Sequence, residues 1–595
     1  MKRVIFALVC AVALSALARP NAVDVEAQVD EIFARWTSST PGCAVGAAVD
    51  GKPVLAKAYG MADLEHDVKN TPDTIFEAGS VSKQFTAAAV LLLAKDGRLS
   101  LDDPVRRYIP EVTDFPPPPV ALSSGRGETS PKPGDVLPAP QSVKASVPIT
   151  IRHMLNHTSG LRDWGSIAAI AGWPRTTRVH THAHVLEIVS RQRTLNFTPG
   201  TRYSYSNTGY NLAAILVARV SGMPFADFTR QRIFEPLGMT HTSWRDDHTR
   251  IVRNRAIAYD EAPSRSASSG ERFHTDMPFE KVHGNGGLLT TVGDLLTWNE
   301  NFVTPAIGGA RFAAEQQQPG RFSDGRPHGY ALGLMVGVHN GVRQVDHSGS
   351  TAGYRAHLAR YPDQHLSVAV LCNVSSANAT QAARAVADLY LSDRARPTPP
   401  PTPTYALTAA DIEKTAGLYR HTITGAPLLI ARDGQRLRVE RGLSDGLNVE
   451  RGQPLVALSA SAFVTAAEQR WEFDGRGGAR ATDAYGTVDT YERVEPAKPM
   501  PDRLKEFVGT YVSDEAETTL TVAIDGGSLV IRRRPDTTLQ LTPVYADAFT
   551  APQLGLVIFR RDAGRVTALS VVQDRVWDLR FARRTPSAPT SQSGQ

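Results

Sequence analysis

The segment EAGSVSKQFTAAAVLLLAKDG, residues 77–97, places one serine and one lysine three positions apart at the start of an apolar helix. This spacing puts the side chains of Ser80 and Lys83 on one helix face, and Gly97 marks the predicted helix end. The helix is apolar on nearly all sides, so it should cross a core, where desolvation favours a neutral lysine. A neutral amine beside a hydroxyl can accept its proton and activate it as a nucleophile. The alternative is an ordinary lysine that reaches the surface.

A second motif, Tyr205-Ser206-Asn207, lies on a loop that follows Pro199-Gly200 and precedes a helix. A tyrosine near the lysine could relay a proton, and the asparagine amide could hold a substrate carbonyl. The alternative interpretation is a capped loop with a packed tyrosine. Taken alone, this motif therefore leaves both interpretations open.

A third motif, His347-Ser348-Gly349, lies on a predicted strand. Its glycine permits a substrate to approach the backbone closely. A second His-x-Gly, at residues 339–341, is typical of the Asn-Gly tip of the preceding hairpin. That tip would place His347 along the strand that follows it.

These three motifs, in this order, resemble the serine β-lactamase and penicillin-binding protein superfamily, closest to class C β-lactamases, D-aminopeptidases and related esterases. The resemblance covers about residues 23–395 and includes similar strings at 149–161, 234–242 and 284–298. It implies acyl transfer, in which Ser80 attacks a carbonyl, Lys83 and Tyr205 move its proton, and water hydrolyses the acyl-enzyme. Which of the two is the working base stays open.

The resemblance also implies the substrate-binding groups. Asn207 would orient the substrate amide, and the backbone N–H groups of Ser80 and Ser350 would form the oxyanion hole beside Gly349. No metal or other cofactor is implied. Many relatives carry lysine at the position of His347, and histidine is only partly charged near neutral pH. Substrates that end in a carboxylate are therefore disfavoured, and D-aminopeptidase or esterase activity is favoured.

Strand-like runs at both ends of residues 23–394, with helices between them, predict an α+β domain whose ends share one antiparallel sheet flanked by helices. The first run turns at Asp50-Gly51, a typical hairpin dipeptide. Residues 114–146, rich in proline, serine and glycine, are expected to be a flexible surface insertion. The resemblance implies the serine β-lactamase/transpeptidase-like form of this architecture.

The proline-rich stretch 395–406 predicts a linker, and beyond it the chain repeats itself. IEKTAGLYR resembles LKEFVGTYV, and LLIARDGQRLRV resembles LTVAIDGGSLVI, at one shared offset of 92 residues. Two matches at one offset indicate a duplication. Short alternating strands with Asp-Gly turns predict two small antiparallel, lipocalin-like barrels at 407–497 and 501–585, before a disordered tail at 586–595.

Residues 1–22, MKRVIFALVCAVALSALARPNA, combine a basic start, an apolar run and small residues, which is typical of a cleaved secretory signal peptide. The sequence therefore predicts a periplasmic or secreted protein. The apolar run is shorter than the roughly 20 residues that span a bilayer, and no integral membrane segment is expected after cleavage. Cys43 and Cys372 could pair in an oxidising compartment or remain buried thiols.

The composition, 42% hydrophobic and 21% charged with a net charge of +5, describes a globular chain without a basic run, which argues against a nucleic-acid partner. His180, His182 and His184 could suggest zinc, but no HExxH or HxHxDH pattern accompanies them. The expected partner is a small molecule or short peptide, which could come from the cell wall.

The predicted function is hydrolysis of amide or ester bonds, as in D-aminopeptidases, D-peptidases or esterases. One alternative is a β-lactamase or a D-Ala-D-Ala carboxypeptidase. A non-enzymatic alternative is a penicillin-binding cell-wall sensor that acylates once without turnover. A burst without steady turnover would distinguish the sensor.

Overall fold

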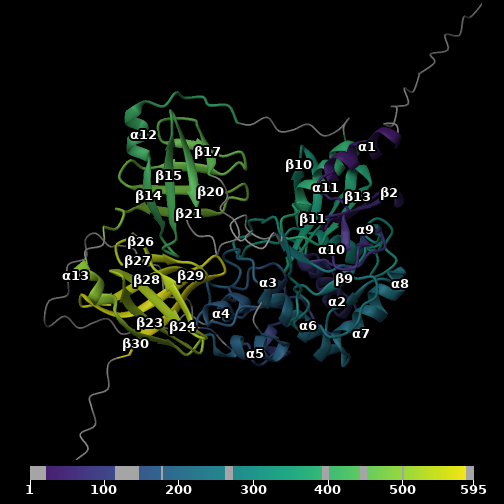
Figure 1. The fold of residues 1–595 in the computed structure, drawn as a ribbon, viewed down its shortest axis with the longest axis horizontal. Coiled ribbons are helices and arrows are strands. Elements are labelled where there is room, and N and C mark those ends of the chain that lie inside the picture. Colours follow the sequence, from purple (N-terminus) through teal and green to yellow (C-terminus); the bar gives the residue numbers. More distant parts are fainter. Residues whose placement is uncertain are drawn as a thin grey trace, which may run out of the picture.

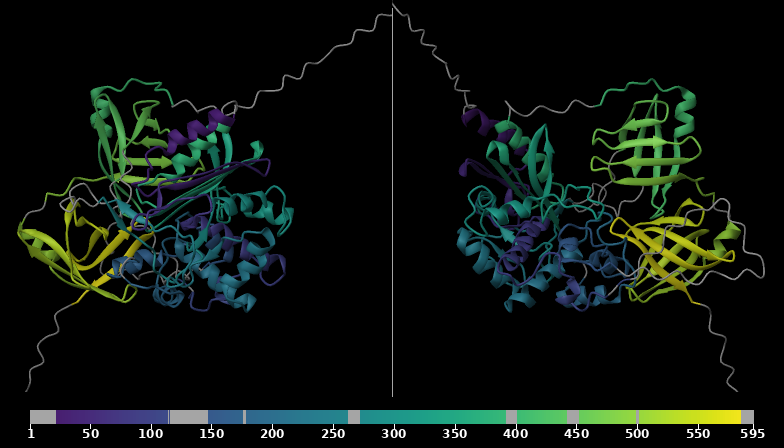
Figure 2. Two further views of the ribbon diagram at one scale, coloured as in Figure 1. Left: turned by 45° about the vertical axis from the view of Figure 1, so that its right-hand side comes forward. Right: turned by 180° about the vertical axis from the view of Figure 1, so that it is seen from behind.

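The computed structural model describes residues 22–113, 115, 147–175, 178–261, 272–391, 401–441, 452–498 and 501–584. It consists of a domain of sheet and helices and two β-barrels, which lie on the same flank of that domain (Figures 1 and 2). The predicted signal peptide up to residue 21 and the tail at 586–595 lie outside the described residues. So does the predicted insertion, apart from Phe115, which is buried in the core.

The first domain is built on a six-stranded antiparallel sheet. In spatial order its strands are β10 (Met335–His339), β11 (Val342–Thr351), β12 (Tyr354–Tyr361), β13 (Leu366–Cys372), β1 (Cys43–Val49) and β2 (Lys52–Tyr59). Strand β1 turns into β2 at Asp50-Gly51 and pairs with β13, so the two ends of the domain share one sheet, as predicted. Cys43 lies opposite Cys372 across this pair, and the two form a disulfide.

Helices cover both faces of this sheet. Alternate residues of β13 point to opposite faces, so Val368 and Val370 contribute to one core while Ala369 and Leu371 contribute to the other. The first core lies under α1 (Ala22–Phe33) and α11 (Ala379–Leu391). The second, larger core holds α2 (Lys83–Lys95), α3 (Ile151–Leu155), α4 (Trp164–Ile170), α5 (His182–Arg191), α6 (Asn207–Ser221), α7 (Phe225–Thr229), α8 (Glu235–Leu237), α9 (Val292–Glu300) and α10 (Ala310–Gln317).

Short strands connect these helices to the rest of the domain. They are β3 (Met61–Asp63), β4 (Val68–Lys69), β5 (Phe76–Glu77), β6 (Ser243–Trp244), β7 (Tyr259–Glu261), β8 (Phe273–Thr275) and β9 (Leu288–Thr290). Within the described residues, no single helix is both long and apolar enough to cross a membrane. The bent pair formed by α6 and residues 225–237 passes that test by length and composition only.

Helix α2 is the element that the opening segment predicted. It follows a single turn of 3-10 helix, η1 (Gly79–Ser82), and ends before Gly97, which has the left-handed φ of +70°. Every side chain of α2 from Lys83 to Leu93 is buried. The lysine therefore lies inside the core, and the surface interpretation of this residue is wrong.

The first barrel is closed and has eight strands. After α12 (Ala409–Thr415) come β14 (Gly417–His421), β15 (Pro427–Asp433), β16 (Arg436–Arg441), β17 (Gln453–Ala457), β18 (Ala462–Val464), β19 (Arg470–Phe473), β20 (Gly478–Thr482) and β21 (Val488–Arg493). Alternate residues fill its interior with aromatic and aliphatic side chains, among them Phe463 and Trp471.

The second barrel is nearly closed rather than closed. It follows α13 (Pro501–Leu504), and its nine strands are β22 (Gly509–Ser513), β23 (Thr518–Asp525), β24 (Ser528–Arg533), β25 (Thr537–Gln540), β26 (Thr542–Tyr545), β27 (Ala548–Ala551), β28 (Gly555–Asp562), β29 (Arg565–Gln573) and β30 (Val576–Arg583). Strands β25 and β26 form the two ends of the sheet. Leu541 alone separates them, too short a connection for a hairpin, so the seam stays open there.

Both barrels contain the same local structure, as the predicted duplication requires. In each, the first strand opens with a glycine that lies under the guanidinium of an arginine on the last strand. A tyrosine two residues later donates its hydroxyl hydrogen to the carbonyl four residues before it. The residues are Gly417, Arg493, Tyr419 and Thr415 in the first barrel and Gly509, Arg583, Tyr511 and Phe507 in the second.

Candidate active site

Ser80 and Lys83 lie together at the junction of η1 and α2. Lys83 Nζ is 3.0 Å from Ser80 Oγ, 3.0 Å from Asn207 Oδ1 and 2.7 Å from the carbonyl oxygen of Asn285. The lysine is fully buried. Burial, followed by the positive charge of Arg575, lowers the pKa of Lys83 well below its usual value.

The contacts of Lys83 fit a neutral amine. A neutral amine has two N–H donors and one lone pair. Asn207 Oδ1 and the Asn285 carbonyl can accept the two hydrogens, and the remaining position faces Ser80 Oγ. The lone pair can therefore receive the proton of the Ser80 hydroxyl.

Tyr205 completes this group from the loop before α6. Its hydroxyl hydrogen-bonds with Ser80, and burial raises its pKa to about 12, so it is protonated at neutral pH. Its ring packs at a tilt of 36° against His157, whose Nδ1 accepts a hydrogen bond of 3.2 Å from the backbone N–H of Ser206. The buried His157 thus holds the loop that carries Tyr205.

Asn207 is fixed at the start of α6 through its backbone. Its N–H donates to Asp163 Oδ2 at 2.7 Å, while Asp163 Oδ1 caps α4 by accepting from the N–H of Ser166. The side-chain amide of Asn207 is therefore held toward Lys83 by two elements at once.

His347 lies on β11, as predicted, but it carries no charge at neutral pH. Burial lowers its pKa to about 3, because the charged imidazole would lose its water. Its Nδ1 donates to the Ser348 carbonyl, and its Nε2 accepts from the hydroxyl of Tyr330 at 2.9 Å. His347 is therefore a neutral group in this site and supplies no cation to a substrate carboxylate.

Two glycines bring η1 against β11. A Cβ on Gly349 would lie 2.0 Å from the Ala78 carbonyl oxygen and 3.1 Å from the Ser80 nitrogen. A Cβ on Gly79, which has a φ of +50°, would lie 2.6 Å from the Ser350 nitrogen. This close backbone approach places the N–H groups of Ser80 and Ser350 beside the same cavity, as an oxyanion hole requires.

The cavity over these residues has a volume of about 940 Å³. Ser80, Tyr205, Asn207 and His347 line it, and so does Arg575 from the second barrel. Arg575 belongs to the turn between β29 and β30, and its guanidinium carbon is 4.9 Å from the centre of the Tyr205 ring. A barrel thus contributes a charged side chain directly beside the reacting groups.

The three histidines near α5 do not converge on one point. One ring nitrogen of each histidine bonds to a different backbone group: His180 to the Trp173 carbonyl, His182 to the His283 carbonyl and His184 to the Thr181 N–H. They are used to hold loops and to cap α5.

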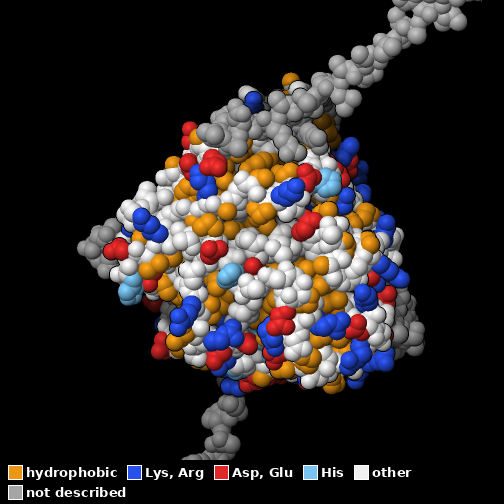
Figure 3. All heavy atoms as spheres, turned by 90° about the vertical axis from the view of Figure 1, so that its right-hand side faces the viewer, with side chains coloured by type: hydrophobic (Ala, Val, Ile, Leu, Met, Phe, Trp, Pro, Cys, Tyr) orange, Lys and Arg blue, Asp and Glu red, His pale blue; other side chains and the backbone are white. Residues whose placement is uncertain are grey.

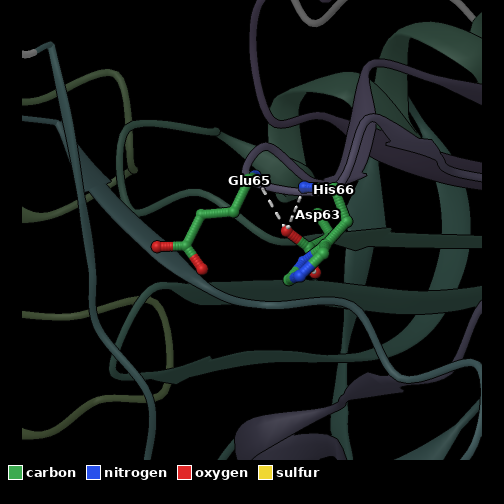
Figure 4. Close-up of side chains that lie close together, drawn as sticks. All are labelled: Asp63, Glu65 and His66. Carbon is green, nitrogen blue, oxygen red and sulfur yellow. Dashed lines mark hydrogen bonds and ion pairs between the residues drawn. The ribbon is translucent and has the colours of Figure 1, made fainter.

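Asp63, Glu65 and His66 form the group of possible metal ligands found among the described residues. Asp63 accepts hydrogen bonds from the backbone N–H groups of Glu65 and His66 and lies 2.8 Å from His66 Nδ1 (Figure 4). These contacts are those of a capped surface turn.

Sequence reasoning missed several residues of this site: Asn285, Asp163, His157 and Arg575. Asn285 and His157 lie within strings that already resembled the superfamily, and Asp163 lies two residues after one, but their contacts depend on the fold. Arg575 had no signal at all, since it lies in an ordinary hairpin turn of a separate barrel.

On the outer face of the first domain, positive and negative side chains are interspersed (Figure 3).

Comparisons with known proteins agree with this geometry. The family model described as Beta-lactamase matches residues 25–391. A D-aminopeptidase of Gluconobacter oxydans (strain 621H) is 27% identical over 581 residues, covering 94% of this chain and 98% of that protein. A D-aminopeptidase of Brucella ovis is 24% identical, covering 89% and 93%. These similarities extend over the barrels.

Among solved structures, the octameric penicillin-binding protein homologue from Pyrococcus abyssi has a TM-score of 0.51 with 22% identity. It covers 80% of this chain and 100% of that one. This likeness shows a shared fold.

Proposed function

We propose a function for this chain on the basis that it belongs to the Beta-lactamase family. It is an exported D-aminopeptidase that cleaves short peptides through an acyl-enzyme on Ser80. Family membership and the D-aminopeptidase relatives make the chain a serine hydrolase that acts on amide bonds. The D-configuration, the aminopeptidase specificity and the export are the proposed part.

The observation that carries the mechanism is the buried, uncharged Lys83 beside Ser80. Lys83 takes the proton of the Ser80 hydroxyl as Oγ attacks the amide carbonyl. The negative charge that develops on the carbonyl oxygen is stabilised by the N–H groups of Ser80 and Ser350. Lys83 is the better base of the two candidates, because Tyr205 holds its proton up to a pKa of about 12.

Tyr205 then acts as a proton relay. The leaving amine must gain a proton. The Tyr205 hydroxyl beside Ser80 can donate its proton to that amine and take the proton held by Lys83 in its place. Asn207 orients the amide of the substrate. Water then attacks the ester carbonyl on Ser80, and Lys83 accepts its proton. The bond between the acyl carbon and Ser80 Oγ breaks, Lys83 returns the proton to Oγ, and the acid product leaves the free enzyme.

Two observations support the finer proposal. The D-aminopeptidase of Gluconobacter oxydans is similar over nearly its whole length, barrels included. The Cys43–Cys372 disulfide joins neighbouring strands of the central sheet, and disulfides persist in oxidising compartments outside the cytosol.

The first prediction tests the base. Lys83→Ala should lower kcat/KM for D-alanine p-nitroanilide at least about a hundredfold, because a general base is lost. Mass spectrometry should then find no acyl adduct on Ser80 with a slowly hydrolysed ester. The matched control is Lys95→Ala, which removes an exposed lysine from the other end of α2. A Lys83→Ala protein that still acylates Ser80 at the wild-type rate would contradict the mechanism, and cleavage of the L-anilide alone would contradict the D-specificity.

A further inference from the structure

The cavity over Ser80 is lined by more positive than negative side chains. Arg175, Arg355 and Arg575 line it, together with the exposed carboxylate of Asp574. Arg175 and Arg355 form hydrogen bonds with the wall of the first domain. Arg175 donates to both oxygens of Glu280, and Arg355 donates to the carbonyls of Ala352 and Tyr354 in its own turn.

Arg575 differs from these two in where it lies. Its guanidinium is against the ring of Tyr205, the residue whose hydroxyl bonds to Ser80. It is therefore close to the place where the leaving part of a substrate must lie. The position of His347, from which a cation would come in many relatives, holds a neutral ring instead.

The turn that carries Arg575 is held rigidly. The backbone carbonyl of Arg575 accepts from the N–H of Asp163 and from Nδ2 of Asn196, whose Oδ1 accepts from the N–H of Trp577. The Trp577 ring packs on Phe197 with centroids 5.1 Å apart. A cation placed in this way is preorganised, so a ligand need not order it.

We propose that Arg575 is a specificity-determining residue that binds a carboxylate of the substrate, close to the scissile amide. A guanidinium and a carboxylate form two parallel charge-assisted hydrogen bonds when both groups lie in one plane. The Arg575 guanidinium, which lies against the Tyr205 ring, can therefore bind the planar carboxylate of a substrate. The preferred substrates are therefore di- or tripeptides with a free C-terminal carboxylate, rather than amides of the same residues. This reverses the expectation drawn from His347, because the cation comes from Arg575 of the second barrel instead. This inference rests on the proposed function and names the substrate class of that site.

The test compares two substrates that differ only in that group, D-alanyl-glycine and D-alanyl-glycinamide. The full-length protein should cleave the acid with a kcat/KM at least about tenfold above that of the amide. Arg575→Gln should lower this ratio at least about tenfold, and Arg575→Lys should retain part of it. The control is Arg565→Gln, which removes an exposed arginine from the opposite end of β29 and should keep the wild-type ratio.

Equal cleavage of the two peptides by the wild-type protein would overturn this inference alone, and so would an unchanged ratio in folded Arg575→Gln. Cleavage of neither peptide would overturn the proposed function, and this inference with it. The wild-type comparison needs no variant, so it decides the question even if Arg575→Gln does not fold.

Discussion

At the scale of single residues, Lys83 shows how the fold obtains a base from an ordinary side chain. Its amine is buried among two carbonyl-type acceptors and a hydroxyl, and no carboxylate of the described residues forms a hydrogen bond with it. A charged ammonium would be poorly solvated there, and the neutral form is the reactive one. The same burial that makes the lysine useful also makes it unfavourable for stability.

The second prediction concerns pH. Lys83 acts only when neutral, and its pKa is lowered well below 10.5, so kcat/KM should rise with pH through one ionisation with a midpoint well below 10.5. His347, with a pKa of about 3, adds no ionisation between pH 5 and 8. A pH–rate profile of wild type and His347→Gln should therefore show the same midpoint. A midpoint that disappears in this variant would assign the ionisation to His347 instead.

The sign of the stability effect follows from the same shift. Below pH 10.5 the unfolded chain binds a proton at Lys83, while the folded chain binds one only below the lowered pKa. Unfolding therefore takes up a proton between these two values, and this group's contribution to the free energy of unfolding rises with pH across that window.

Sequence reasoning located Ser80 and Lys83 because both lie on one short, strongly apolar segment, where spacing alone fixes the geometry. Asn285 and Arg575 could not be located in this way. Asn285 contributes a backbone carbonyl, which every residue has, and Arg575 comes from a chain segment almost 500 positions away. The neutrality of His347 depends on burial, which a motif does not report.

At the scale of elements, the contact between η1 and β11 aligns Ser80 with the strand that lines the same cavity. The strand and its hairpin tip at Asn340-Gly341 were predictable from alternation and turn chemistry. The single 3-10 turn before α2 was not, because it arises where Gly79 takes a left-handed φ to meet the strand.

The third prediction tests this contact. Gly349→Ala would place a Cβ 2.0 Å from the Ala78 carbonyl oxygen, so β11 must move away from η1. A shift of about 1 Å in the oxyanion hole should lower kcat roughly a hundredfold. Gly337→Ala on β10 is the control, since a Cβ there would have nothing within 4 Å. Steady-state kinetics on both variants decides, and a fully active Gly349→Ala would show that the contact does not set the site.

At the scale of the whole molecule, the second barrel is attached to the catalytic domain by buried polar contacts. Arg162 bonds to Glu515 at 2.5 Å with both side chains buried. Arg533 and Arg534 donate to the carbonyls at the end of α4. The docking interface thus places two positive charges at the C-terminal end of α4, where the helix dipole is negative, and it also contains a buried ion pair.

The fourth prediction separates this buried pair from its exposed neighbour. Glu515→Gln leaves Arg162 buried without its counter-charge and should lower the free energy of unfolding by about 3 kcal/mol. Asp514→Asn affects an exposed pair with Arg193 and should change it by less than about 0.5 kcal/mol. Urea denaturation of both variants measures the difference. Equal effects would mean that the barrel does not depend on the Arg162 pair for its attachment.

The docking surface could not be predicted from the sequence, although the two barrels could. Repeated turns and alternating strands predict a barrel. Glu515 and Arg162, in contrast, are separated by more than 350 positions and resemble ordinary charged residues in the sequence. The open seam of the second barrel could not be predicted either. Its seam depends on one connecting residue, Leu541, in a pattern that otherwise matches the first barrel.

The duplication of the barrels has a consequence for how this enzyme can evolve. The last hairpin of each copy meets the catalytic domain: Tyr485 of the first touches the Val336 carbonyl, and Arg575 of the second reaches the cavity. The corresponding turns of the two repeated barrels thus contact the catalytic domain at two different places. Mutations confined to one of these short turns can therefore change what borders the cavity during evolution and leave Ser80 and Lys83 unaltered.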